Sequence, residues 1–281
     1  MSNMACTGSG LLATRAHRAF GEIPSVYILH IGNKNYSSWS LRPWLLMRAR
    51  DIAFEERLTP FDDVDNWARF RAFSPSGEVP CLVDGDTVVW DSLAIAEYLA
   101  EHHVGVWPSD AAARTWARCA AAEMHAGFPV LRQVCTMNCG IRVALDAVPA
   151  KLSRELQRLD ELLSQGLSRF DGPWLAGSDF SAVDAFYGPV AFRWQTYGFE
   201  VSAPLADYFR RLLALPAAAN WYQAALREPW RDAAHEAEVK DVGRVLQDLR
   251  VGSRAALMSA AACRAGVAAQ GWMSAKDSTR S

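Results

Sequence analysis

Two neighbouring serines stand where their hydroxyls could stabilise a negative charge. Ser37 and Ser38 lie in a polar loop that follows residues 26–31, a run of β-forming side chains, and precedes a segment of helical period. A hydroxyl at the N-terminal end of a helix can donate to a thiolate, and the helix end adds a favourable field. Lowering a thiol pKa from ~8.5 to ~6.5 requires about 2.7 kcal/mol, which one charge-assisted hydrogen bond and a helix terminus can supply. The alternative is an ordinary polar loop, because serine is common in loops.

Pro43 locates the start of the helix that follows the two serines. Proline is tolerated in the first turn of a helix, where its missing N–H would be unpaired in any case. The sequence therefore predicts Ser40 as the N-cap residue and leaves Ser37 and Ser38 just ahead of the helix.

A second candidate pair, Asp91 and Ser92, belongs to a strand, hairpin, strand and helix pattern over residues 79–103. Two short runs of β-branched and aromatic residues flank Asp84-Gly85, which is a strong hairpin signal. Asp91 and Ser92 are good N-cap residues for the apolar helical stripe that follows them. The N-terminus of that helix can hold a carboxylate or phosphate, because it carries unpaired N–H groups and a partial positive charge. The alternative is that both residues only cap their own helix.

Val79-Pro80 opens the first strand of this pattern. Proline within a sheet is confined to strand starts, edges and bulges. The backbone before Pro80 is therefore free to pair with an extended peptide.

These features together resemble the glutathione site of cytosolic glutathione transferases. The resemblance implies a cis bond between Val79 and Pro80, with Val79 binding the cysteinyl backbone of glutathione. It also implies that Asp91 and Ser92 hold the γ-glutamyl end.

Glu78 departs from the pattern of that family. Many relatives place a basic residue just before the Val-Pro pair, where it meets the glycine carboxylate of glutathione, whereas this chain has Glu78. Glu78 is kept among the expected glutathione-binding residues by its position. Arg42, Lys34 and Arg71 are the alternatives for the carboxylate, and the sequence does not choose among them.

The segment YSSWSLRPWLL resembles the Ser-Ser-Cys-Ser-Trp-Arg stretch of zeta-class glutathione transferases, in which the first serine activates glutathione. The resemblance gives that role to Ser37, with Ser38 as its neighbour, in a serine-type, zeta- or theta-like bacterial member. Trp39 replaces the cysteine of the family, so chemistry that depends on that thiol is not implied. Tyr36 is the rival activator, because other classes use a tyrosine. The family's tyrosines lie further upstream, which favours Ser37.

The resemblance covers residues 25–230 and implies an α/β plus all-α architecture. A thioredoxin-like, glutathione-binding domain is expected at residues 25–105, where the pattern indicates βαβ, a helix, then ββα. An all-helical substrate-binding domain is expected at residues 110–231, beginning with one long helix over 111–135.

The first helix of the second domain lines the substrate pocket in the family. Met124, Phe128 and Arg132 are therefore candidates for the pocket. The alternative is that Met and aromatic residues at helical spacing are plain core.

Two further patterns are interpreted as structural. Ser181 and Asp184 have the spacing of a capping box, and the motif resembles the one that opens the central core helix of glutathione transferases. Cys135 and Cys139 are more simply two small apolar helix residues than a metal or thiol pair, because no His or Cys follows at zinc spacing.

Both ends of the chain extend beyond the resemblance. Residues 1–24 lack a signal-peptide core and are expected to be disordered, with an organelle presequence as the alternative because they contain few acidic residues. Residues 232–281 are expected to form at most a loosely attached helix, with disorder.

Composition excludes several classes of function. A chain of 281 residues with 51% hydrophobic and 21% charged residues is typical of a soluble globular protein of two domains. The net charge of −2 provides no basic field for nucleic acid, and no apolar run approaches the ~20 residues of a membrane span. The six cysteines are scattered without a C-x-x-C motif, which favours a cytoplasmic protein with neither disulfides nor a metal.

The resemblance thus implies a homodimeric glutathione transferase acting in detoxification. Glutathione would be the co-substrate, and its thiolate would be conjugated to an electrophilic, apolar small molecule. One alternative is a zeta-like cis–trans isomerase of maleylacetoacetate type, which uses the same thiolate without consuming it. Another is a non-catalytic protein with this fold that acts by binding a partner. A thiol-disulfide oxidoreductase is disfavoured, because the activating position carries Ser37 in place of cysteine.

Overall fold

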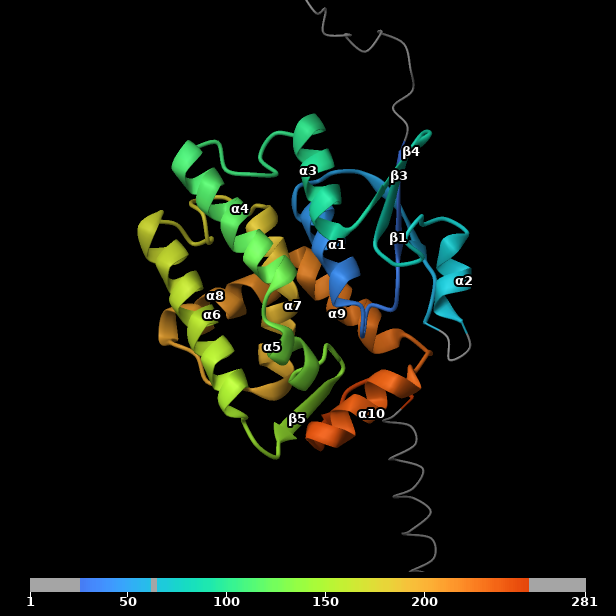
Figure 1. The fold of residues 1–281 in the computed structure, drawn as a ribbon, viewed down its shortest axis with the longest axis vertical. Helices are drawn as coiled ribbons and strands as arrows, with labels where there is room; N and C mark the ends of the chain where they lie inside the picture. Colours follow the sequence, from blue (N-terminus) through green and yellow to red (C-terminus); the bar gives the residue numbers. More distant parts are fainter. Residues whose placement is uncertain (1–25, 62–64, 253–281) are drawn as a thin grey trace, which may run out of the picture.

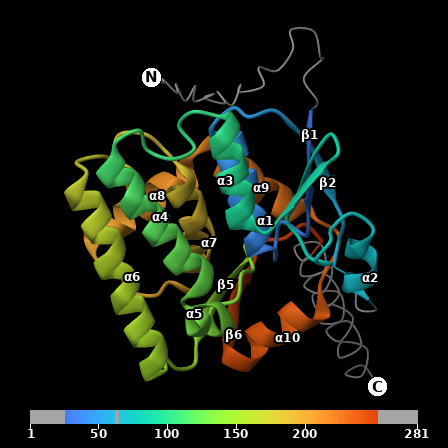
Figure 2. The ribbon, with the colours of Figure 1, turned by 45° about the horizontal axis from the view of Figure 1, so that its top comes forward.

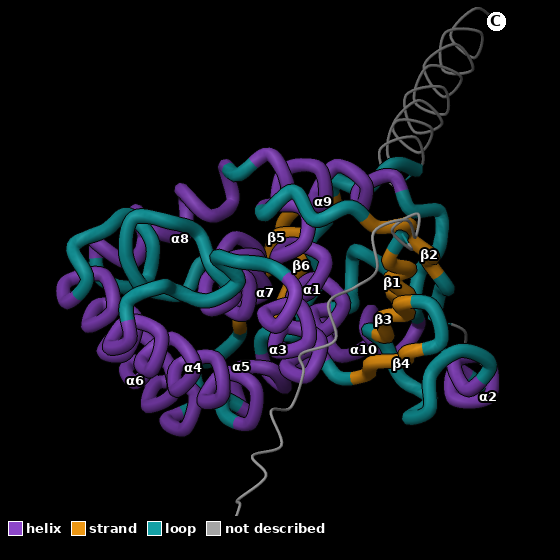
Figure 3. The backbone as a smooth tube through the Cα atoms, turned by 90° about the horizontal axis from the view of Figure 1, so that it is seen from above, coloured by secondary structure: helices purple, strands orange, loops and turns teal. Residues whose placement is uncertain are grey.

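The chain folds into a sheet-containing first half and a mainly helical second half, as the ribbon and tube views show (Figures 1 and 3). The computed structural model describes residues 26–61 and 65–252. The expected α/β plus helical architecture is therefore confirmed.

The first half has one four-stranded sheet in the order β2-β1-β3-β4. β1 pairs with β2 in parallel, and β3 pairs antiparallel with β1 and β4. The strands are β1 (Tyr27–Ile31), β2 (Phe54–Leu58), β3 (Cys81–Asp84) and β4 (Thr87–Trp90). The helices between and after them are α1 (Ser38–Ala49), α2 (Asn66–Arg71) and α3 (Ser92–His102). This is the order βαβ, helix, ββα that the sequence predicts for a thioredoxin-like domain.

α1 begins one turn earlier than predicted. Its N-cap is Ser37, whose side chain accepts a hydrogen bond from the backbone N–H of Ser40, so the prediction of Ser40 as the cap is wrong. Pro43 consequently lies inside the helix. The proline rule failed here because the capping hydroxyl of Ser37 satisfies a free N–H ahead of the proline, so the helix starts there.

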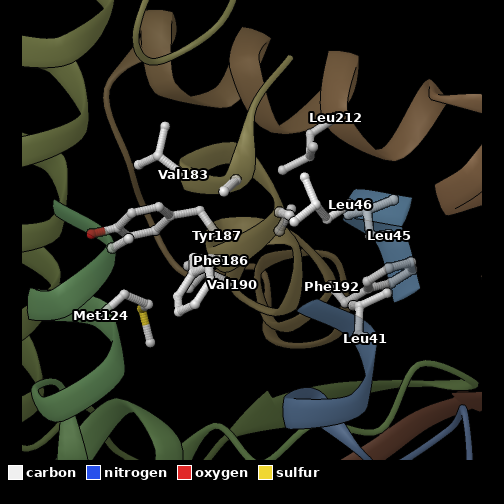
Figure 4. Close-up of a cluster of buried hydrophobic side chains, with 14 of the residues drawn as sticks. Leu41, Leu45, Leu46, Met124, Val183, Phe186, Tyr187, Val190, Phe192 and Leu212 are labelled. Atoms are coloured by element: carbon white, nitrogen blue, oxygen red, sulfur yellow. The ribbon is translucent and has the colours of Figure 1, made fainter. Parts of the chain in front are cut away.

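The second half is organised around α7 (Ala182–Tyr197), which is buried along almost its whole length. The expected capping box is present, with both the Ser181 and the Asp184 side chains bonded to backbone N–H groups. Gly188 allows α1 to approach closely, because a Cβ there would lie 2.8 Å from a methyl carbon of Leu45. Figure 4 shows side chains of α1 and α7 meeting in this core. The other helices are α4 (Ala111–Ala126), α5 (Pro129–Val134), α6 (Ala150–Arg169), α8 (Ala203–Ala214) and α9 (Pro216–Arg227).

The single helix predicted over residues 111–135 is two helices. α4 ends at Ala126, and Phe128 takes a left-handed conformation with φ of 56° before Pro129 opens α5. Proline cannot continue the preceding helix, so the chain turns at this point. The turn redirects α5 and changes where its side chains lie.

The extension after residue 231 is packed onto the body of the protein, in contrast to the loose attachment expected for it. α10 (Ala233–Val242) leads into β6 (Gly243–Asp248), which pairs antiparallel with β5 (Ile141–Leu145). Figure 2 shows α10 running across the lower end of the molecule, from the side of β6 toward α2. Neither strand was predicted, because each gains its stability from pairing with a segment about a hundred residues away. The expectations for residues 1–24 and for 253–281 lie outside the described residues.

Among the helices that the structure describes, none is both long and apolar enough to cross a bilayer.

Candidate functional site

Two adjoining cavities bring the two sequence motifs together. A cavity of about 790 Å³ is lined by Ser37 and Ser38, and a smaller one of about 250 Å³ is lined by Asp91 and Ser92. The two share Trp39, Glu78 and Val79 in their linings. Segments 54 residues apart in the chain therefore meet at two adjoining cavities, and the larger has the size of a small-molecule site.

Ser37 is buried at the N-terminus of α1. Its hydroxyl donates to Ser40 Oγ at 2.8 Å, and Ser40 Oγ also accepts the N–H of Gly32 at 3.1 Å. Ser38 is half-buried and lines the same cavity. The first turn thus presents two hydroxyls beside the positive end of the helix macrodipole.

Tyr36, the rival activator, is already bonded elsewhere. Its hydroxyl donates to Glu236 Oε1 at 2.8 Å and accepts from Arg250 at 3.2 Å. Burial raises the pKa of the Tyr36 phenol well above its usual value, and the neighbouring Glu236 carboxylate raises it further. Tyr36 therefore belongs to a hydrogen-bonded cluster that fixes α10.

One side of the adjoining cavities, here called the hairpin wall, consists of Val79, Pro80, Asp91 and Ser92. The Val79–Pro80 bond is cis, as the resemblance implies. Strand pairing of β3 begins only at Cys81, opposite His30, so Val79 precedes the paired part of the strand.

Asp91 and Ser92 occupy the start of α3. Asp91 has φ of 75°, and its Oδ1 accepts the N–H of Leu93 at 2.7 Å. Ser92 is buried, and its hydroxyl accepts from Arg42 at 3.3 Å. The second carboxylate oxygen of Asp91 lies 3.5 Å from His125 Nε2. Asp91 caps the helix, Ser92 is its first residue, and both line the smaller cavity.

Three arginines, Arg42, Arg132 and Arg193, lie close enough together for their charges to interact, and two of them contact Trp39. The guanidinium of Arg42 lies 4.1 Å from the centre of the Trp39 ring, and that of Arg132 lies 5.0 Å from it. Burial lowers the pKa of Arg42 to about 9, and the charges of Arg132 and Arg193 act in the same direction. Buried Nε atoms of both Arg42 and Arg132 lack a hydrogen-bond partner.

Arg193 of α7 lines the larger cavity with Arg132. It is 4% exposed, and its Nε donates to the Cys135 carbonyl at 2.7 Å. Within residues 26–61 and 65–252, none of the three arginines forms an ion pair. Cationic side chains without a counter-ion favour an anion in the cavity, since an uncompensated buried charge is costly.

The extension supplies another part of the lining of the larger cavity. Asp232 and His235 of the α10 start line it, and His235 Nδ1 lies 2.7 Å from Asp232 Oδ1. We call Arg132, Arg193, Asp232 and His235 the far wall. Sequence reasoning named only Arg132 of these four. The spacing of Asp232 and His235, as N-cap and third helical residue, was the one local signal available for that pair.

The residues expected to line a substrate pocket divide between the cavity and the core. Arg132 lines the larger cavity. Met124 and Phe128 lie instead in the hydrophobic core, at 0% and 5% exposure. Figure 4 shows Met124 beside Phe186 and Tyr187 of α7. The break between α4 and α5 accounts for this difference, because it turns Arg132 rather than Met124 toward the opening.

The residues considered as partners for the glycine carboxylate of glutathione lie in different parts of the molecule. Lys34 is 2.5 Å from Glu56 Oε1 and lies against the Trp44 and Trp221 rings, away from both cavities. Arg71 is exposed and lies 5.5 Å from the ring of Trp67, which lines the larger cavity. Glu78 is exposed and lines both cavities.

The two cysteines predicted as small apolar helix residues lie just after α5, so the prediction of helix at these positions is wrong. Cys135 and Cys139 are buried free thiols, and burial raises the pKa of Cys135 to about 12. Across the part of the chain that the structure describes, no group of three or more His, Cys, Asp or Glu side chains could hold a metal ion.

Comparison with known proteins agrees with this fold. Residues 36–102 match the family model for the glutathione S-transferase N-terminal domain, and residues 142–224 match that for the C-terminal domain. The chain therefore belongs to the glutathione S-transferase family.

Solved structures with the same fold include the theta-class glutathione S-transferase of Xanthomonas axonopodis pv. citri with glutathione bound. It has a TM-score of 0.54 and 24% identity, covering 71% of this chain and 98% of that one. A glutathione-bound glutathione transferase homolog from Burkholderia has a TM-score of 0.51 and 20% identity, covering 71% of this chain and 97% of that one. At these identities the likeness concerns the fold.

Curated relatives match over shorter or more divergent stretches. The dichloromethane dehalogenase of Methylorubrum extorquens is 42% identical over 57 residues, which is 20% of this chain and 20% of that protein. The chain thus spans about a fifth of the length of that relative. The probable maleylacetoacetate isomerase of Vibrio cholerae is 25% identical over 194 residues, covering 66% of this chain and 90% of that protein.

Proposed function

We propose that this protein is a glutathione transferase, which conjugates the glutathione thiolate to an electrophilic small molecule. The observation that carries the proposal is the pair of adjoining cavities, both lined by Val79, of which one is lined by the serines of the α1 start and the other by the Asp91–Ser92 start of α3. An extended tripeptide can lie along Val79 with one carboxylate at the N-terminus of α3 and its sulfur near the N-terminus of α1.

Ser37 stabilises the thiolate in this proposal. Its hydroxyl hydrogen rotates from Ser40 Oγ to the sulfur of bound glutathione, and the N-terminus of α1 adds its field. A lower thiol pKa raises the thiolate fraction at neutral pH. Holding the electrophile in the larger cavity beside the thiolate then adds the advantage of proximity.

Replacement of Ser37 tests this role. We expect Ser37→Ala to lower kcat about 100-fold, the effect of removing one donor to a developing anion. The pKa of the bound thiol, followed by thiolate absorbance, should rise, while glutathione affinity should change less than about threefold. The matched control is Ser153→Ala on the exposed face of α6. An unchanged rate in Ser37→Ala would move the role to Ser38 or Tyr36.

A second candidate function is a zeta-like, glutathione-dependent cis–trans isomerase of the maleylacetoacetate type. The far wall favours it, because Arg132 and Arg193 line the cavity with no ion-pair partner in the described chain and would suit a substrate bearing carboxylates. The match to the Vibrio cholerae protein also supports it. Turnover of maleylacetoacetate without net loss of glutathione would establish this function. Conjugation of neutral electrophiles, with no such isomerisation, would exclude it.

A non-catalytic protein that binds glutathione or a partner is the remaining alternative. It would show no glutathione-dependent turnover with a broad panel of electrophiles.

We also propose a cytoplasmic homodimer that acts in detoxification and needs no metal. The open edge of the sheet supports an assembly, because β4 exposes Val88 and Trp90 there. Light scattering on the purified protein measures the assembly.

A further inference from the structure

Asp232 and His235 form a hydrogen-bonded pair that lines the same cavity as Ser37 and Ser38. The pair lies at the start of α10, in the extension beyond both matched domains. The proposed stabilisation of the thiolate by Ser37 assigns no role to the Asp232–His235 pair.

Asp232 fixes the orientation and the hydrogen-bonding state of the imidazole. Asp232 is 7% exposed, and its Oδ1 accepts the backbone N–H of His235 at 3.0 Å and lies 2.7 Å from the ring Nδ1. Burial alone would raise the pKa of Asp232, but the hydrogen bonds from His235 hold that pKa below its usual value. A carboxylate that accepts from Nδ1–H leaves Nε2 as the nitrogen that can exchange a proton. Nε2 has no hydrogen-bond partner in the described part of the chain.

Two aromatic rings hold the imidazole plane. Phe61 stacks on it with the ring centres 5.6 Å apart and an angle of 9°, and Tyr36 lies 5.1 Å away at 31°. Tyr36 directly precedes Ser37. The imidazole therefore stands beside the loop that carries the two candidate serines.

The helix that carries His235 is itself clamped to that loop. Glu236, the next residue, accepts from the Tyr36 hydroxyl at 2.8 Å, from Asn138 Nδ2 at 3.0 Å and from both terminal nitrogens of Arg250. Proton transfer by a side chain requires heavy atoms to approach within ~2.6–3.2 Å. This clamp supplies the fixed placement that such a transfer needs.

We propose that His235, positioned by Asp232, is a catalytic acid–base residue for addition of glutathione to electron-poor double bonds. The inference rests on the proposed function and narrows its substrate class to alkenes conjugated to a carbonyl group. His235 Nε2 takes the proton that leaves the thiol. The sulfur lone pair then forms the C–S bond at the β-carbon, and the π electrons move onto the carbonyl oxygen. Nε2 returns the proton to the α-carbon, so the product gains S and H across the former double bond.

Displacement reactions do not require the return of a proton to carbon. When the thiolate replaces an aromatic chloride, the chloride leaves with its bonding electrons and no carbon is protonated. The thiol proton can leave through water in the open cavity. A proton-returning histidine should therefore matter for addition and hardly at all for displacement.

The test compares two neutral electrophiles, benzylideneacetone for addition and chlorodinitrobenzene for displacement. We expect His235→Gln to lower kcat for addition about 100-fold, the usual contribution of a general acid–base group, and to change displacement less than about threefold. The matched control is His102→Gln at the exposed end of α3, which should change neither rate. An equal fall in both rates would show that His235 only packs α10, and no fall in addition would show that it does not transfer the proton. Either outcome would overturn the proposal.

Asp232→Asn tests the positioning residue with the same pair of reactions. We expect a smaller, roughly tenfold loss that is again confined to addition, because the ring loses its preferred tautomer while keeping its place. An equal loss in both reactions would overturn the positioning role. Failure of the proposed function itself looks different, since the unaltered protein would then turn over neither electrophile.

Discussion

The hairpin wall and the far wall of the cavity are built in different ways. Val79, Pro80, Asp91 and Ser92 fall within 14 consecutive residues and are held by strand pairing and helix capping. The far wall draws Arg132, Arg193, Asp232 and His235 from α5, α7 and the α10 start. Local backbone structure positions the first set, whereas packing and side-chain hydrogen bonds position the second.

The difference suggests a division of labour between the walls. The hairpin wall offers a strand entrance and a helix N-terminus, which suit the constant co-substrate glutathione. The far wall offers charged and titratable side chains on separate elements, which suit selection and conversion of a second substrate. Changes in the hairpin wall should therefore affect glutathione binding, while changes in the far wall or its supports should affect the second substrate.

Loss of the Ser92 hydroxyl should produce the largest effect on binding. We expect Ser92→Ala to raise the KM for glutathione about 10- to 100-fold, because the γ-glutamyl carboxylate loses a buried hydrogen bond. Steady-state kinetics with glutathione as the varied substrate measure this. Ser153→Ala, on exposed α6, is the control. A KM change no greater than that of the control would remove Ser92 from the glutathione site.

Breaking the clamp of the far wall should have the next largest effect. Arg250 is 5% exposed and bonds to both Glu236 and Asp248, so Arg250→Met removes the guanidinium that pairs with both carboxylates. We expect a loss of about 2 kcal/mol in the free energy of unfolding, with faster amide hydrogen exchange in α10. Arg244→Met, at an exposed position of β6, is the matched control. Unaltered exchange in α10 would show that Arg250 does not hold this helix.

A change away from both walls should affect stability without affecting chemistry. Asp184 accepts hydrogen bonds from the backbone of Ser181 and Leu175 and from the Tyr208 hydroxyl. We expect Asp184→Ala to lower the free energy of unfolding by about 1–2 kcal/mol, with unchanged turnover per folded molecule. Asp207→Ala, in an exposed pair with Arg210, should cost far less. A fall in turnover at full folding would connect Asp184 to the site.

Acidification should have the smallest of these effects on stability, because it weakens the Glu236 cluster that supports the far wall. Burial alone would raise the pKa of Glu236, but hydrogen bonds from Arg250 and Tyr36 hold it below its ordinary value of 4.5. A carboxylate with a lowered folded-state pKa stabilises the fold above its unfolded pKa, and this contribution is lost as the pH falls through the folded-state pKa. The stability difference between the natural protein and Glu236→Gln should therefore shrink by up to about 1 kcal/mol on acidification below pH ~4.5. Urea unfolding across this range measures it, and a constant difference would refute the linkage.

Local patterns in the sequence predicted most of the first half. The Asp84-Gly85 hairpin, the Asp91–Ser92 start of α3 and the order of strands and helices agree with the structure, because each depends on neighbouring residues. The predicted start of α1 was one turn too late, because it was placed from Pro43 alone and capping by Ser37 was not considered. The division between α4 and α5 was missed although Pro129 marks it.

The sequence by itself determined that a strand entrance and a capped helix would form a local site, because hairpins and caps are specified by adjacent residues. Only the tertiary structure decided that β6 would pair with β5, that Tyr36 would bond to Glu236, and that His235 would reach the cavity of Ser37. These contacts join residues about 100 to 200 positions apart, so no local pattern records them. Their stability comes from pairing and burial that exist only once the whole chain has folded.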